Sequence, residues 1–172
     1  MLPSRAFAQS CRQLRDDTVA IHPQLLQGSN RVTRVSRSAL VPQSASLMYQ
    51  LVADIEAYPH FLPWCADATI HKRSALEVVA TLNLAKGPVR KAFSTRNTLH
   101  PEQRIELQLL DGPFKSLKGE WNFAQLGDDG SRVQLELEFE FSSRLLAMTV
   151  GPIFNEIANT MVQAFCDRAR AL

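Results

Sequence analysis

Cysteines and long apolar runs are scarce in this sequence. Its 172 residues include only three cysteines, Cys11, Cys65 and Cys166, and no two of them form a CxxC pair. This wide spacing argues against a disulfide framework and against a structural zinc site, and it fits a reducing compartment. No stretch approaches the roughly 18 uninterrupted apolar residues of a membrane-spanning helix. We therefore expect a cytoplasmic protein that associates with a membrane, if at all, only at its surface.

Motifs of catalysis are also absent. The sequence contains no phosphate-binding loop, no HExxH motif and no GxGxxG motif. Its four histidines, His22, His60, His71 and His100, are scattered, and none is paired in sequence with a serine or cysteine in a nucleophile motif. We expect a protein that is not an enzyme, with no metal site and no required cofactor. A lone buried acid or base acting in a cavity stays an open alternative.

The charge of the chain is nearly balanced. The sequence contains 19 lysines and arginines and 17 aspartates and glutamates, which gives a formal net charge of +2. This balance excludes a positive field over the whole domain, so a protein that binds nucleic acid over its whole surface is not expected. The cations are nevertheless concentrated, because seven basic residues stand against three acidic ones between Lys86 and Lys118. That segment offers a local basic surface.

The first 32 residues differ from the rest. Residues 1–32 lack sustained periodicity and contain two prolines and a Gly-Ser-Asn turn. Up to Arg15 they carry arginines and serines without an acid, as organellar transit peptides do, but Asp16 and Asp17 break that pattern. We predict a poorly ordered extension over 1–32 and one folded domain over 33–172. A mitochondrial location is expected only if the extension is a transit peptide.

Alternation of apolar and polar residues dominates the middle of the chain. It is clearest over 131–142, where apolar residues from Val133 to Phe141 alternate with one glutamine and three glutamates. One face of such a strand meets a core and the other meets water. A first strand begins near Thr33, and further strands are predicted over 65–73, 76–85, 89–99, 104–111 and 117–126. Short breaks rich in glycine and proline favour antiparallel hairpins between them.

Helical patterns flank the strands. Ser44 is the predicted N-cap of a short helix that Tyr58-Pro59 ends. A long helix with an apolar stripe closes the chain, and either Ser142 or Ser143 can cap it. Gly151-Pro152 should kink this helix or divide it into a short first piece and a long second piece.

Together these elements predict an α+β fold with a seven-stranded curved antiparallel sheet around a long C-terminal helix. One helix cannot fill the concave face of so wide a sheet, so we expect a cavity between them. The proline-stiffened loop Phe61-Leu62-Pro63-Trp64 either plugs the end of the core or forms the lip of this cavity.

Two sets of side chains are candidates to line the cavity, one apolar and one polar. The candidate ligand-binding residues are Phe61, Leu62, Trp64, Leu82, Phe93, Leu107, Leu109, Phe114, Trp121, Phe123, Ile153, Phe154, Ile157, Met161 and Phe165. The candidate polar groups inside the cavity are Arg37, Thr95 and Asn97.

Several motifs, in order, carry a resemblance to a known family. They are Val35–Val41, Met48–Val52, Tyr58–Cys65, Thr95–Asn97, Asp111–Phe123 and Ala164–Ala169. Over residues 33–171 the chain resembles the coenzyme Q-binding START-like proteins, which belong to the wider SRPBCC or polyketide cyclase-like group. The resemblance implies a helix-grip fold with a hydrophobic tunnel. The extension over 1–32 and Pro152 inside the last helix depart from the bacterial pattern.

The resemblance implies two functions. Mitochondrial members are associated with ubiquinone binding and respiratory electron transfer, which favours a non-enzymatic protein that binds ubiquinone or a similar polyprenyl lipid and touches membranes peripherally. A bacterial branch contains ribosome-association toxins that bind the large ribosomal subunit and block subunit association, and this is the alternative. The candidate ribosome-binding surface is formed by Arg90, Lys91, Arg96, Lys115 and Lys118. The oligomeric state stays open.

Overall fold

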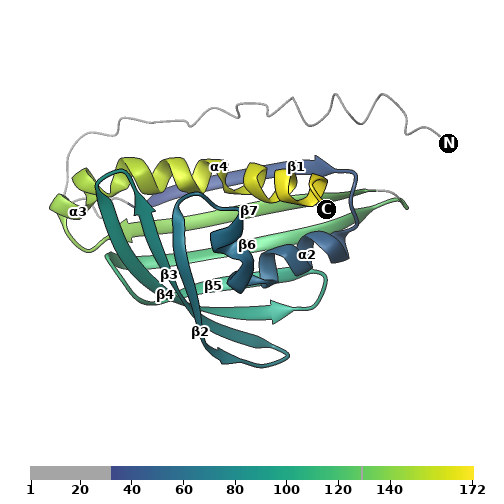
Figure 1. Cartoon of the computed structure of the whole chain (residues 1–172), viewed down its shortest axis with the longest axis horizontal. Coiled ribbons are helices and arrows are strands. Elements are labelled where there is room, and N and C mark those ends of the chain that lie inside the picture. Colours follow the sequence, from purple (N-terminus) through teal and green to yellow (C-terminus); the bar gives the residue numbers. More distant parts are fainter. Residues whose placement is uncertain (1–31, 129) are drawn as a thin grey trace.

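The described residues form one seven-stranded antiparallel sheet. The computed structural model describes residues 32–128 and 130–172, so the predicted extension over 1–32 lies outside it except for Val32. The strand order is β1-β7-β6-β5-β4-β3-β2. The strands are β1 (Thr33–Val41), β2 (Cys65–Arg73), β3 (Glu77–Lys86), β4 (Val89–His100), β5 (Arg104–Asp111), β6 (Phe114–Leu126) and β7 (Gly130–Phe141). The predicted fold class is confirmed (Figure 1).

The main difference from the predicted strands is at the start of β6. This strand begins at Phe114, where 117 was expected, and Phe114 already pairs with Phe141 of β7 across a local irregularity in register. The turn before it is tight. Gly112 has a φ of +144°, and a Cβ atom there would lie 2.7 Å from the Cβ of Phe93. Glycine is therefore required at this turn, since any larger residue meets both strain and a clash.

The helices begin where the caps predict. Ser44 accepts a hydrogen bond from the backbone N–H of Leu47 and starts α2 (Ala45–Ala53). Ser143 likewise caps the short helix α3 (Arg144–Thr149). The long helix α4 (Gly151–Arg170) follows directly, with Pro152 in its first turn, where a missing N–H costs nothing. The predicted division at Gly151-Pro152 is confirmed.

One helix boundary differs from the prediction. Tyr58-Pro59 does not end a single helix, because α2 ends at Ala53 and a separate 3-10 helix, η1 (Ile55–His60), contains Pro59. The change of helix type at Asp54 turns the chain so that Ile55 and Tyr58 are both buried. No helix among the described residues is long and apolar enough to cross a bilayer.

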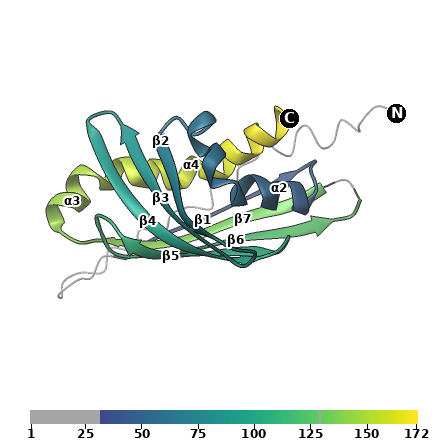
Figure 2. The same ribbon diagram turned by 60° about the horizontal axis from the view of Figure 1, so that its bottom comes forward.

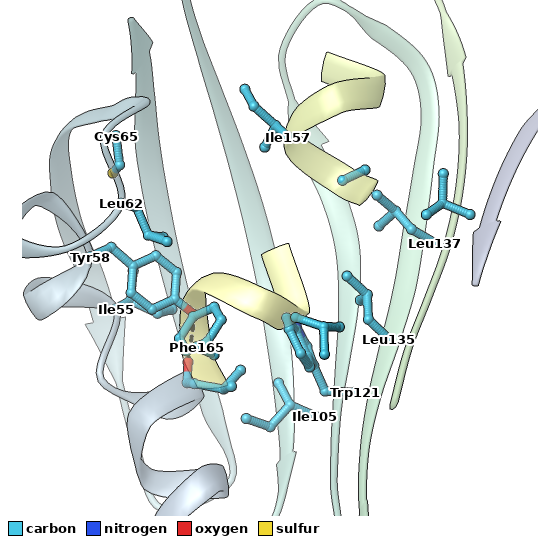
Figure 3. Packing of buried hydrophobic residues seen from close by; sticks show 14 of the residues in the cluster. Ile55, Tyr58, Leu62, Cys65, Ile105, Trp121, Leu135, Leu137, Ile157 and Phe165 are labelled. Atoms are coloured by element: carbon cyan, nitrogen blue, oxygen red, sulfur yellow. Dashed lines mark hydrogen bonds between the residues drawn. The ribbon is translucent and has the colours of Figure 1, made fainter. Parts of the chain in front are cut away.

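Helix α4 lies along the concave side of the sheet, and α2 and η1 lie on the same side (Figures 1 and 2). Burial of each large apolar side chain of α4 contributes about 1.5–3 kcal/mol to this packing. The buried stripe of α4 consists of Phe154, Ile157, Ala158, Val162, Phe165, Cys166 and Ala169. Figure 3 shows Phe165 between Tyr58 and Trp121, with ring centroids 5.3 Å away on each side.

Candidate functional site: a small cavity between the sheet and α4

A cavity lies between the concave face of the sheet and α4. The centre of a water-sized sphere can move through about 60 Å³ of it. A single water needs roughly 10–15 Å³ by this measure, so the space holds a few waters. Helix η1, the loop before β2, strands β3 to β7 and α4 all contribute to its wall. The lining residues are Ile55, Tyr58, Trp64, Ala80, Leu82, Phe93, Thr95, Asn97, Leu107, Leu117, Trp121, Leu135, Leu137, Phe154, Ile157 and Met161.

Two polar side chains stand in this apolar wall. Thr95 and Asn97 are two residues apart on β4, so they share the inward face, and they are only 4% and 5% exposed. The side-chain oxygen of Asn97 is buried and receives no hydrogen bond from any residue that the structure describes. A buried acceptor without a partner costs about 1–3 kcal/mol. The domain thus retains a polar group that its own packing does not use.

The hydroxyl of Tyr58 is already engaged. It donates a hydrogen bond of 2.6 Å to the carbonyl of Val52, so Tyr58 offers the cavity only its ring. Burial raises the pKa of this phenol well above its ordinary value. Burial likewise raises the pKa of the neighbouring Cys65 thiol to about 11. Neither group is ionised near neutral pH.

The predicted ligand-binding residues separate into two groups. Those that line the cavity are Trp64, Leu82, Phe93, Leu107, Trp121, Phe154, Ile157 and Met161, together with the polar Thr95 and Asn97. Those that do not line it are Phe61, Leu62, Leu109, Phe114, Phe123, Ile153 and Phe165. Trp64 is only 5% exposed, so it is an inner wall of the cavity and not a solvent-facing lip.

Aromatic side chains pack together in the space where the tunnel was predicted. Phe114, Phe141 and Phe154 pack against one another with ring centroids 4.7–6.2 Å apart. The rings of Phe165 and Phe61, neither of which lines the cavity, have centroids 5.2 Å apart. These rings occupy part of the space between the sheet and α4 in which the tunnel was predicted.

Arg37 does not line the cavity, although it was a candidate polar group there. It lies on β1, where its guanidinium donates hydrogen bonds to the carbonyl of Ser36 and to the side-chain oxygen of Asn159 on α4. The inward direction was inferred correctly from strand parity. At the edge strand, however, the inward face meets the flank of α4, so the arginine joins sheet to helix.

Several lining residues were not among the candidates. Ile55 and Tyr58 were not predicted to line the cavity, because the 3-10 helix that carries them was not foreseen. Leu135 and Leu137 lie on the inward face of β7, and alternation alone assigned them to the core without showing which part of it is hollow. The close approach of β5, β6 and β7 at Gly119 brings Leu107 and Leu137 together at the wall.

The predicted basic surface is largely neutralised. On the convex face Arg96 pairs with Glu77 at 3.2 Å and Lys118 pairs with Glu138 at 2.9 Å. Lys115 similarly lies 3.3 Å from Glu140. The hydrogen bond from Lys72 and that from Lys118 hold the pKa values of Glu77 and Glu138, respectively, below the ordinary value. Such exposed pairs leave little net charge for an anionic partner.

Arg90 and Lys91 are different from the other three cations. Both are exposed at the start of β4, and neither forms an ion pair with an acidic residue in the described part of the chain. The hairpin between β3 and β4 lies at the same end of the domain as α3 (Figures 1 and 2). Helix α3 adds Arg144 and two strongly exposed apolar side chains, Leu145 at 69% and Met148 at 73%. We call Arg90, Lys91, Arg144, Leu145 and Met148 the α3 end.

The curved seven-stranded sheet, the C-terminal helix and the cavity between them define a START-like helix-grip domain. Similar solved structures are the Zhui aromatase/cyclase of a Streptomyces species and a START superfamily protein of Mycobacterium smegmatis. The first has a TM-score of 0.69 and 18% identity over 81% of this chain and 94% of that one. The second has a TM-score of 0.68 and 22% identity over 80% and 97%. At these identities the likeness concerns the fold.

Residues 41–166 match the family described as polyketide cyclase / dehydrase and lipid transport, and the chain belongs to this family. A relative in Pseudomonas aeruginosa named ribosome association toxin RatA is 43% identical over 140 residues, which are 81% of this chain and 97% of that protein. The mitochondrial coenzyme Q-binding protein COQ10 of Drosophila melanogaster is 28% identical over 78% of this chain and 57% of that protein.

Proposed function

We propose that this protein associates with the ribosome as a toxin of the RatA kind, acting on the large subunit and opposing subunit association. The observation that carries the proposal is the similarity to RatA, at 43% identity over nearly the whole of that protein. The likeness to COQ10 is lower and covers little more than half of the longer protein. The alternative function inferred from the sequence is thus the better supported one.

The cavity supports this order of preference. Its volume of about 60 Å³ suits a few waters and is too small for a substituted quinone ring with a polyprenyl tail. Ubiquinone could bind there only if the cavity widened. A role on the outside of the domain requires no such rearrangement.

We further propose that the protein is not an enzyme. The lining contains no histidine, cysteine, aspartate, glutamate or lysine, which are the usual groups for proton transfer. The single phenol, Tyr58, is occupied by its bond to Val52. A cytoplasmic location follows from the proposed ribosomal partner.

The α3 end is the proposed contact with the ribosome. Arg90, Lys91 and Arg144 are exposed cations, and a phosphate backbone would compete with no carboxylate partner for Arg90 and Lys91. The predicted cations Arg96, Lys115 and Lys118 are less suitable, because each would first have to leave a glutamate. The neutralised convex face is therefore not the proposed surface.

Sedimentation with purified large subunits tests both the proposed ribosome association and the α3 end as its surface. We expect the full chain to sediment with the subunit at low salt and to dissociate as salt rises, since released counterions drive such binding. The triple variant R90Q/K91Q/R144Q should bind more weakly, with a salt slope reduced by about 1 for each lost phosphate contact. Arg132→Gln is a matched control, because Arg132 is an exposed cation near the start of β7, about 30 Å from α3 at ~3.4 Å per residue.

The outcomes separate the function from the surface. If the protein neither sediments with the subunit nor affects subunit joining, the proposed function is wrong. If the wild-type protein and the triple variant bind equally well, the proposed function stands, but the α3 end is not the binding surface.

Quinone binding is the second candidate function. It is favoured by the similarity to COQ10 and by an apolar cavity that contains Thr95 and Asn97. Mass spectrometry of organic extracts from protein purified in its native host tests it. A polyprenyl quinone in stoichiometric amount would support quinone binding, and protein without any quinone would contradict it.

A further inference from the structure

We propose that the α3 end docks on the surface of an anionic lipid bilayer. Its two apolar side chains enter the headgroup region, and its three cations face lipid phosphates. Docking on vesicles involves no ribosome, so this inference is tested separately from the proposed function.

Helix α3 presents apolar side chains to water. Leu145 and Met148 are three residues apart, so they share one face of the helix, and both are strongly exposed. Leu146 packs against the core on the other side, and Val150, directly after the helix, is buried. Folding therefore uses the Leu146 side of α3 and leaves Leu145 and Met148 outside the hydrophobic core. Arg144 lies four residues before Met148, so it shares their face.

The hairpin between β3 and β4 brings two more cations to this helix. The rings of Phe93 on β4 and Phe154 on α4 have centroids 6.1 Å apart, so the start of β4 lies beside the first turns of α4. Those turns follow α3 directly, and Figures 1 and 2 show the hairpin and α3 at the same end of the domain. Arg90 and Lys91 precede Phe93 by a few residues. Neither they nor Arg144 form an ion pair with an acidic residue that the structure describes.

Most of the acidic side chains at this end are engaged. Glu140 lies 3.3 Å from Lys115, and Glu156 lies 2.6 Å from Lys86. Asp111, at the end of β5, is exposed, but the three cations of the α3 end outnumber it. The net charge of this end of the domain is therefore positive, as attraction to an anionic surface requires.

The combination of exposed cations and exposed apolar side chains favours a bilayer as the partner. A nucleic-acid backbone would contact the cations and leave both apolar side chains in water. A bilayer satisfies both kinds of group, because anionic lipids attract cations and the headgroup boundary accepts apolar side chains. The two side chains protrude from a helix at the end of the domain, which suits a soft surface that side chains can enter (Figure 1).

The same cations cannot contact lipid and ribosomal RNA at once. A bilayer would therefore compete with the large subunit for the α3 end. This consequence, unlike the docking itself, rests on the proposed function.

Co-sedimentation of the full chain with lipid vesicles tests the docking. We expect binding to phosphatidylcholine vesicles that contain about 30% phosphatidylglycerol, and binding at least about tenfold weaker to pure phosphatidylcholine. The triple variant R90Q/K91Q/R144Q should bind the anionic vesicles about fivefold more weakly for each cation removed. Leu145→Gln should weaken binding about tenfold, because less apolar surface leaves water. Leu145→Trp should bind more tightly, since tryptophan prefers the headgroup boundary.

Leu76→Gln is the matched control. Leu76 is about as exposed as Leu145, so the two substitutions remove a similar apolar area, and neither should disturb folding. Leu76 directly precedes β3, whose other end lies next to the hairpin with β4, about 30 Å away at ~3.3 Å per residue. Its replacement should leave vesicle binding unchanged.

Three results with vesicles would overturn the inference. They are a wild-type protein that binds neither kind of vesicle, one that binds both kinds equally, and a Leu145→Gln variant that binds as well as Leu76→Gln. A dimer of the free protein that Leu145→Gln dissociates, seen by analytical ultracentrifugation, would assign the surface to a second copy and would also overturn the inference.

The result on vesicles and the result on ribosomes remain distinguishable. Failure to bind vesicles overturns the docking and leaves the proposed ribosome association standing. Binding to anionic vesicles without binding to large subunits supports the docking and contradicts the proposed function.

Discussion

Replacing Asn97 with leucine should stabilise the folded domain. The side-chain oxygen of Asn97 is buried without a hydrogen-bond partner among the described residues, in a site that is 5% exposed. Such an acceptor costs about 1–3 kcal/mol, and an apolar group of similar volume removes that cost. Because packing around the new methyl groups is imperfect, we expect a gain of about 1 kcal/mol, or roughly 2–4 °C in Tm for a chain of this size.

Urea unfolding measures the effect, and the slope with denaturant should stay constant so that the midpoint reports stability. Asn83→Leu is the matched control. Asn83 lies on the outward side of β3, and its amide donates to Asp67 at 3.2 Å, so its loss should be neutral or mildly destabilising. A loss of more than about 1 kcal/mol in Asn97→Leu would refute the reasoning, because it would mean that ordered water or a ligand already satisfies the amide.

Four further predictions concern the core, one turn and the response to pH. Gly112→Ala should destabilise the domain by about 2 kcal/mol or more in urea unfolding, since its Cβ meets Phe93 and its φ of +144° is unfavourable for alanine. Phe165→Ala should cost about 3–5 kcal/mol, because the ring is fully buried against Trp121; a cost under about 1 kcal/mol would contradict this packing. In a variant that lacks Cys11 and Cys166, native Cys65 should react with iodoacetamide at pH 8 at least about 100-fold more slowly than in urea. The reason is that a pKa of about 11 leaves little thiolate. A rapid reaction of the native protein would show that the thiol is accessible. Lys118 and Arg34 lower the pKa of Glu138, so the contribution of Glu138 to stability is present above about pH 4.5 and is lost as the pH falls further. Glu138→Gln should therefore make the unfolding free energy depend less on pH in that range. An unchanged pH dependence would contradict this prediction.

A charged residue at position 165 is not a useful probe of the ligand. Phe165 was one of the candidate ligand-binding residues in the sequence. The structure shows a side chain with 0% exposure that lies outside the cavity wall, so an aspartate there would bury a charge without a partner. Asn97 and Thr95 are better positions, because their replacements alter the cavity and leave the core packing nearly intact.

Local patterns in the sequence were sufficient to predict the seven strands and the capped helices, but not the 3-10 helix η1. Alternation over β7 and the stripe on α4 reflect the periods of strand and helix, so they report which face is buried before any partner is known. The caps at Ser44 and Ser143, and the break at Gly151-Pro152, depend on atoms within a few residues of one another. Inward parity of Thr95 and Asn97 followed from the same rule.

The extent of the cavity and the balance of surface charge were decided only by tertiary structure. Whether Phe114 or Phe154 borders a tunnel or fills it depends on rings from β4, β6, β7 and α4 that meet only after folding. The same holds for Lys118, whose partner Glu138 is brought opposite by the register of β6 and β7. A one-dimensional pattern specifies the direction of each side chain, whereas the space it occupies and the charge beside it depend on residues far away in the sequence.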